Sequence, residues 1–197
     1  MLMMNASARC SFLAVPLLAA LGCSDPVPPP AQGAVTLEIG QPTTPVDQMF
    51  CPVTKTYQVA ATDSKTKMLA APTASDPGES VISGESGSSI SCSVTGGGGT
   101  FNFSGSFLGF TPQGDKVSLS FSNGTVTNFV GTADVSVYTP DLSANFSGTG
   151  CNITVENKQV KGGSIWAAFE CDQISAPPSN LCGINSSAFV FENCSGS

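Results

Sequence analysis

Apolar and polar residues alternate with period two along most of the chain. The clearest case is residues 116–122, where Val117, Leu119 and Phe121 alternate with a lysine and serines. Shorter runs of the same kind stand at residues 90–94, 101–103, 135–137, 153–155 and 165–169. Because successive side chains of a β-strand point to opposite faces, this pattern predicts strands with one buried face. No stretch places apolar residues at helical spacing over three turns.

Turn-forming residues separate these runs. They stand at Gly96–Gly99, Pro112–Asp115, Asn123–Gly124, Pro140–Asp141 and Gly162–Gly163. Asn-Gly strongly favours a two-residue hairpin, so we expect Asn123–Gly124 to join two neighbouring strands. The pattern as a whole predicts an all-β fold of about nine to eleven antiparallel strands, arranged as a β-sandwich or a jelly-roll-like barrel.

Residues 62–88 form the least regular part of the chain, with charged residues, serines and glycines crowded together. We expect one short strand near residues 67–71 and otherwise a long exposed loop. Long loops often carry function, so this segment is a candidate binding surface.

The amino terminus has the composition of an export signal. Residues 11–22 are mostly apolar, and Arg9 supplies a positive flank. The run is shorter than the roughly 20 residues that span a bilayer, and it fits the hydrophobic part of a signal peptide instead. The proline-rich residues 24–33 predict an extended spacer of about 30 Å, at roughly 3.1 Å per residue. A single folded domain is then expected over residues 34–197.

The end of the apolar run, Ala20-Leu21-Gly22-Cys23, resembles the lipobox of bacterial lipoproteins. The resemblance implies that residues 1–22 are a signal peptide, removed before Cys23, and that the Cys23 thiol carries a diacylglyceryl group. Two or more acyl chains would anchor residues 23–33, and the domain behind them, firmly to a membrane. Ser24 replaces the aspartate that retains many such proteins in the inner membrane, which favours the outer membrane. Free secretion after an ordinary signal peptide is the alternative.

Cysteine parity agrees with export. Removal of Cys10 and use of Cys23 for lipid leave six cysteines: Cys51, Cys92, Cys151, Cys171, Cys182 and Cys194. An even number without a C-x-x-C motif predicts three disulfides rather than a metal or redox site. A hairpin at Gly162–Gly163 would pair Cys151 with Cys171. Alternatively, Cys171 and Cys182 would close the proline-rich loop between them.

The composition excludes several functions. The chain has no histidine, which removes Ser-His-Asp and Cys-His catalysis and zinc sites that need imidazole. Its net charge is −7, and after residue 22 six lysines face fourteen carboxylates. No basic surface is therefore available for nucleic acid.

The remaining candidate sites are few. Trp166 faces away from the core side of its predicted strand, where an exposed indole near Glu170 would stack on a sugar. The alternative, which the sequence favours, is a structural role in which Trp166 packs in a second core or under a loop. Four carboxylates lie in the last third of the chain, at Glu156, Glu170, Asp172 and Glu192. Nothing fixes the separation of two of them as a glycosidase requires.

Oxygen ligands for calcium stand at residues 76–79 and 140–141, but neither segment resembles an EF-hand loop. No cofactor and no metal site are predicted. We therefore expect a non-enzymatic, membrane-anchored lipoprotein of the cell envelope that binds a protein or glycan ligand or serves structurally. A carbohydrate-binding or carbohydrate-active module is one alternative. An envelope stress or protease-inhibitor lipoprotein that presents residues 62–88 is another.

Overall fold

The structure is a computed structural model that describes residues 27–43, 51–59, 62–63, 67–68, 72–73, 78–177 and 180–196. The expected signal peptide, Cys23, the start of the spacer and Asp76 lie outside the described residues. The described part contains the 3₁₀ helix η1 (Glu85–Gly87) and twelve strands. The strands are β1 (Gln32–Gly40), β2 (Lys55–Val59), β3 (Thr62–Asp63), β4 (Lys67–Met68), β5 (Val81–Ile82), β6 (Ser89–Gly97), β7 (Thr100–Phe110), β8 (Lys116–Thr127), β9 (Val130–Tyr138), β10 (Asn145–Lys161), β11 (Ser164–Ala176) and β12 (Asn180–Glu192).

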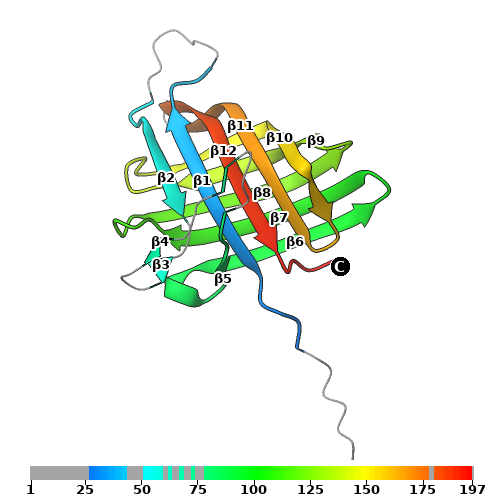
Figure 1. The fold of residues 1–197 in the computed structure, drawn as a ribbon. Helices are drawn as coiled ribbons and strands as arrows, with labels where there is room; N and C mark the ends of the chain where they lie inside the picture. The colour runs from blue at the N-terminus through cyan, green and yellow to red at the C-terminus, as the bar shows by residue number, and fades with distance from the viewer. Residues whose placement is uncertain are drawn as a thin grey trace, which may run out of the picture.

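The prediction of an antiparallel all-β fold is confirmed. Nine strands form one sheet in the order β2-β1-β12-β11-β10-β9-β8-β7-β6, and β5 pairs with β1 as a tenth. From β6 to β12 each strand pairs with the next along the chain, and β1 returns to lie beside β12. The sheet curls over itself, so that β1, β12 and β11 lie in front of β6–β9 and cross them steeply (Figure 1).

Phenylalanine side chains fill the space between the two layers. Phe103 and Phe121 point inward from β7 and β8, and Phe169, Phe189 and Phe191 meet them from β11 and β12. The rings of Phe121 and Phe189 are the closest of these pairs, with centroids 4.3 Å apart. The apolar positions of the period-two alternation therefore lie on the inner face of a curled sheet. Because the sheet curls, this face encloses a core between two layers.

Both edge strands of the sheet are held by contacts to other parts of the chain. At the β6 edge, Val94 donates its backbone N–H to Ser195, Ser195 donates to Cys92, and a disulfide joins Cys92 to Cys194. At the β2 edge, the Lys55 ammonium lies 3.1 Å from Asp115 and 2.8 Å from Asp141. Asp115 belongs to the β7–β8 connection and Asp141 to the β9–β10 connection, so these ion pairs hold the edge strand against the opposite layer.

The outer face of the front layer carries a second, small core. Ala34, Val190 and Trp166 lie in register across β1, β12 and β11, and all three are buried. Residues 72–73 cover this row, because Trp166 donates its indole N–H to the Thr73 carbonyl at 3.0 Å and Thr36 donates its hydroxyl to the Pro72 carbonyl.

Residues 62–88 were expected to form a loop with one short strand, and this expectation is only partly right. A strand does occur at β4, within the expected 67–71. However, β3 and β5 also form, Pro72 and Val81 are buried, and β5 pairs with β1 at Gly33. The physical reason is that apolar surfaces need a cover: residues 72–73 lie over the small outer core, and Val81 of β5 packs into the main core.

The expected hairpin at Asn123–Gly124 is wrong. These residues form a β-bulge inside β8, where the pairing with both β7 and β9 shifts by one residue. The true turn between β8 and β9 is Asn128–Phe129, where both residues have positive φ angles of 52° and 71°. Two consecutive positive φ angles are typical of a type I′ hairpin, and a phenylalanine in that position gives no sequence signal for it.

All six expected disulfide cysteines are paired. The bonds are Cys51–Cys182, Cys92–Cys194 and Cys151–Cys171. The hairpin pairing of Cys151 with Cys171 is therefore the correct alternative, since the β10–β11 strands turn at Gly162–Gly163 and bring the two cysteines opposite each other. The first strand begins at Gln32, two residues before the predicted domain start.

Candidate binding groove

A surface groove lined by polar side chains lies where the pairing of β10 and β11 is interrupted. Ser147 pairs with Ser175, and the next pair in the same register is Asn152 with Glu170. Four residues on each strand lie between these two pairs and are not paired as β-ladder partners. In this stretch the strands are linked by the Cys151–Cys171 disulfide. A hollow of about 580 Å³, which we call the β10–β11 groove, opens at this interruption.

Glycines make the interruption possible. A Cβ atom on Gly148 would lie 2.8 Å from the Gln173 carbonyl oxygen, so only glycine allows β10 to approach β11 this closely. Gly150 has a φ angle of 63°, which an L-residue adopts only with strain. The β10 strand carries a register shift against β9 at the same point, and β11 carries two shifts against β12. Glycines inside a strand pattern were the sequence signal for this site, and the sequence interpretation missed it.

Polar side chains of three kinds line the groove. Hydroxyls come from Ser147, Thr149 and Ser175, amides from Asn152 and Gln173, and carboxylates from Glu170 and Asp172. All seven side chains are exposed to solvent. Asp172 accepts a hydrogen bond from the Thr43 hydroxyl at 3.0 Å. Such a set of donors and acceptors can form many hydrogen bonds with a polar ligand. It contains no cationic side chain that could bind an anion.

Asp134 braces the rim of the groove. Its carboxylate accepts hydrogen bonds from the Asn123 side chain at 2.7 Å and from the Gly150 backbone N–H at 3.0 Å. These two hydrogen bonds, the first being the stronger cause, hold the pKa of Asp134 below its usual value. Asn123 reaches Asp134 because the β8 bulge re-aims it. The bulge that the sequence suggested as a turn therefore helps to fix the backbone at the groove.

The groove lies at the end of the sheet opposite the spacer. The chain enters β1 at Gln32, which pairs with Glu192 near the carboxyl terminus (Figure 1). Leu181, which also lines the groove, lies eleven residues earlier in β12. At about 3.3 Å per residue, the far end of the groove is roughly 35 Å along the sheet from the point where the spacer joins.

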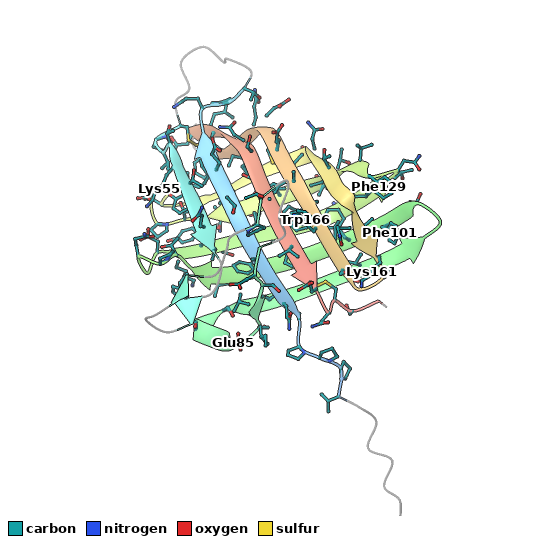
Figure 2. All side chains as sticks on the ribbon, in the orientation of Figure 1. Lys55, Glu85, Phe101, Phe129, Lys161 and Trp166 are labelled. Carbon is teal, nitrogen blue, oxygen red and sulfur yellow. A yellow bond between two sulfur atoms is a disulfide. The ribbon has the colours of Figure 1, made fainter. Side chains whose placement is uncertain are left out.

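Trp166 takes no part in this groove. Its side chain is only 4% exposed, packed against Ala34 and Val190 and covered by residues 72–73, and Figure 2 shows it in the middle of the front layer. A sugar ring needs a free aromatic face, which the described residues do not offer at this position. The position of Trp166 matches the alternative that places it in a second core.

The four carboxylates of the last third do not form one cluster. Glu170 and Asp172 project into the groove from β11. Glu192 lies at the other end of the molecule, where it accepts a hydrogen bond from Ser80 at 2.7 Å. The side chain of Glu156 lies outside the described residues.

Asp141, a possible calcium ligand in the sequence, is occupied by other groups. It accepts hydrogen bonds from the Lys55 ammonium at 2.8 Å and from the Tyr57 hydroxyl at 2.6 Å. The hydrogen bond from Lys55, followed by that from Tyr57, lowers the pKa of Asp141. The hydrogen bonds to Asp141 and then to Asp115 raise the pKa of Lys55. Burial, followed by the hydrogen bond to Asp141, raises the pKa of Tyr57 to about 12. The Thr139 hydroxyl donates to the Tyr57 hydroxyl at 3.2 Å. We call Lys55, Tyr57, Asp115, Asp141 and Thr139 the β2 clasp.

Within the described part of the chain, no three histidine, cysteine, aspartate or glutamate side chains are grouped so as to hold a metal ion. In the same part, no helical segment has the length and apolar character of a membrane span. Comparison with known proteins finds no matching family model, no matching curated protein and no matching solved structure.

Proposed function

We propose that this chain is exported, anchored to a membrane by lipid on Cys23, and works as a non-enzymatic binding module through the β10–β11 groove. The observation that carries the proposal is the complete pairing of the six cysteines after residue 23. Three disulfides are typical of an oxidising compartment outside the cytoplasm. Their pairing leaves Cys23 as the one cysteine of the predicted mature chain without a partner thiol, as a lipid attachment requires.

The position of the groove supports the same proposal. Residues 27–30 have no regular secondary structure, and Val27 is 90% exposed, as expected for a spacer. A chain anchored at Cys23 holds the Gln32 end of the sheet near the membrane. The β10–β11 groove then opens at the far end, where a ligand outside the membrane can reach it.

The chemistry of the groove favours binding over catalysis. Hydrolysis of a glycosidic bond needs two carboxyl groups on opposite sides of that bond, one of them in an apolar environment. Glu170 and Asp172 project from the same face of one strand into water. Hydroxyl and amide groups surround them, which suits reversible hydrogen bonding to a polar ligand.

Fractionation of cells tests the anchor. Wild-type protein is expected to sediment with membranes and to be released only by detergent, whereas a Cys23→Ala variant should lose this behaviour. A Cys10→Ala variant is the matched control, because Cys10 lies in the signal segment and should not affect the anchor. Equal membrane association of the Cys23→Ala and wild-type proteins would contradict lipidation.

Site-specific photo-crosslinking in living cells tests the groove. A crosslinking residue at Thr149, on the groove, is expected to capture one discrete envelope component. The same residue at Pro112, in the exposed β7–β8 connection, should not capture it. Identical products from both positions, or none from Thr149, would argue against a binding role for the groove.

A further inference from the structure

Serine residues form a continuous row across the outer face of the sheet. Six strands, β6 to β11, each contribute one serine, and the serines are paired in register from strand to strand. The row consists of Ser91, Ser106, Ser120, Ser136, Ser147 and Ser175. A one-residue slip in any strand would break this row, so it reflects a precise match between sequence and register.

A second row of polar residues runs parallel to the first. Its members come from the same six strands and are also paired in register: Thr95, Asn102, Thr125, Thr132, Asn152 and Glu170. We call the two rows together the hydroxyl face. Both rows end in the β10–β11 groove, because Ser147, Ser175, Asn152 and Glu170 line it.

The side chains of the hydroxyl face are available to a ligand. Ten of the twelve are exposed, and only Ser120 and Ser136 are partly covered. Ser91 and Ser106 share a hydrogen bond of 2.8 Å, and Ser147 donates to Ser136 at 3.5 Å. Since a hydroxyl has one donor and two acceptor positions, each paired serine keeps further hydrogen-bonding capacity toward solvent.

Charge narrows the choice of ligand. Glu170 is the only charged residue of the twelve, and the whole chain has a net charge of −7. An acidic polymer would meet no cation on this face and would be repelled by the rest of the protein. A cationic polymer would find Glu170 and, beside the rows, Asp134 and Asp172, both of which already accept hydrogen bonds from other groups of the protein. The face therefore matches an uncharged ligand that is rich in hydrogen-bonding groups.

The repeat of the rows points to a polymer. Neighbouring strands of a sheet lie about 4.8 Å apart, so a row offers one hydroxyl, amide or carboxylate at that interval over roughly 24 Å. A sugar unit in an extended polysaccharide chain is of similar length. We propose that the hydroxyl face binds an extended, neutral polysaccharide that runs across the strands into the β10–β11 groove. This inference rests on the proposed binding function and assigns its ligand class.

Native affinity electrophoresis of the mature protein tests the inference, in a detergent without sugar headgroups. Dextran, hydroxyethylcellulose and galactomannan are cast in the gels as neutral probes, with alginate as the acidic one. At least one neutral polymer is expected to retard the wild type, and alginate is not. Because the binding involves no charge, raising the salt concentration should leave the retardation unchanged.

Variants locate the binding surface. Replacing Ser106, Ser120 and Ser136 together with alanine should weaken the retardation at least tenfold. A Ser120→Lys variant should block the row by its bulk, which supplies a second readout. A double variant Thr54→Ala and Thr56→Ala removes exposed hydroxyls from β2 and the residue just before it, away from the hydroxyl face, and should behave as wild type. Near-ultraviolet circular dichroism checks that each variant is folded.

Three results would overturn the inference: no retardation by any neutral polymer, equal retardation of the triple alanine variant, or stronger retardation by alginate. If no polymer binds while Thr149 still crosslinks to a protein in cells, the polysaccharide ligand is refuted and the binding module stands. If a neutral polymer binds on the serine row while Thr149 captures nothing, the hydroxyl face binds without the groove, and the proposed role of the groove fails.

Discussion

The side chain of Trp166 illustrates how strand alternation and exposure differ. Alternation places the indole on the outer face of β11, away from the main core. The outer face at this point is nevertheless apolar, since Ala34 and Val190 lie beside it. The Thr73 carbonyl then satisfies the indole N–H, which removes the cost of burying it.

Substitution of Trp166 should therefore change stability. We expect Trp166→Ala to lower the free energy of unfolding by about 3–5 kcal/mol, because a large buried side chain leaves a cavity. Trp166→Phe keeps most of the contact and loses chiefly one hydrogen bond of about 1 kcal/mol. Chemical denaturation with the disulfides intact measures both. A Trp166→Ala protein as stable as wild type would show that the indole is not buried.

The β2 clasp gives stability a pH dependence of known sign. Asp141 has a lowered pKa in the folded protein, so it adds stability above its unfolded pKa of about 3.9 and loses that contribution as the pH falls. Tyr57 has a raised pKa of about 12. Its contribution is fully present below the unfolded value of about 10 and is lost as the pH rises from there toward 12.

An Asp141→Asn substitution should alter both limbs. It removes a carboxylate whose hydrogen bond raises the pKa of Tyr57, so Tyr57 should titrate closer to 10 while burial keeps it above that value. Titration of tyrosinate absorbance measures this effect in a Tyr138→Phe background, where Tyr57 is the only tyrosine. The stability of Asp141→Asn should also fall less on acidification. An unchanged Tyr57 titration would contradict the hydrogen bond.

Among the elements, β8 contains a bulge at Asn123–Gly124 and is followed by the turn at Asn128–Phe129, and substitutions should distinguish the two. A Cβ atom on Gly124 would lie 2.6 Å from the Phe103 carbonyl oxygen, so Gly124→Ala should destabilise the protein by about 1–3 kcal/mol. Phe129→Gly should be neutral or stabilise by up to about 1 kcal/mol, because it relieves a positive φ angle of 71° at a half-exposed ring. Denaturation midpoints compare the two. The reverse order would place the hairpin at Asn123–Gly124.

Strands with one buried face could be predicted from the sequence because the alternation of β6–β11 directly encodes it. Strand order beyond the hairpins could not, since nothing local pairs β1 with β12. The disulfides Cys51–Cys182 and Cys92–Cys194 join residues more than 100 positions apart, and only the closed fold brings them together. Cys151–Cys171 was accessible because a single hairpin sets it.

The site was predictable only in part. Glu170 and Asp172 were recognised as candidate carboxylates, but the groove around them comes from interrupted strand pairing at Gly148 and Gly150. The serine row likewise depends on register across six strands, which no single segment of sequence reveals. Alternation shows which residues face outward, and the bulges decide which of them become neighbours.

At the scale of the whole molecule, one curled sheet is closed at both edges. The β2 clasp holds one edge by charge, and the Cys92–Cys194 disulfide holds the other with the carboxyl terminus; Lys55 and Lys161 mark these two sides in Figure 2. The amino and carboxyl ends leave from one end of the sheet and the β10–β11 groove opens at the other. This arrangement suits a domain that is held at one end and binds at the other.

Intact-mass analysis of the mature protein from membranes tests the lipid anchor and the disulfides together. We expect a chain that begins at Cys23, carries acyl groups on that residue, and gains six hydrogens on reduction of its three disulfides. A chain that begins elsewhere, or one with an unmodified Cys23 thiol, would contradict membrane anchoring and leave a freely secreted domain.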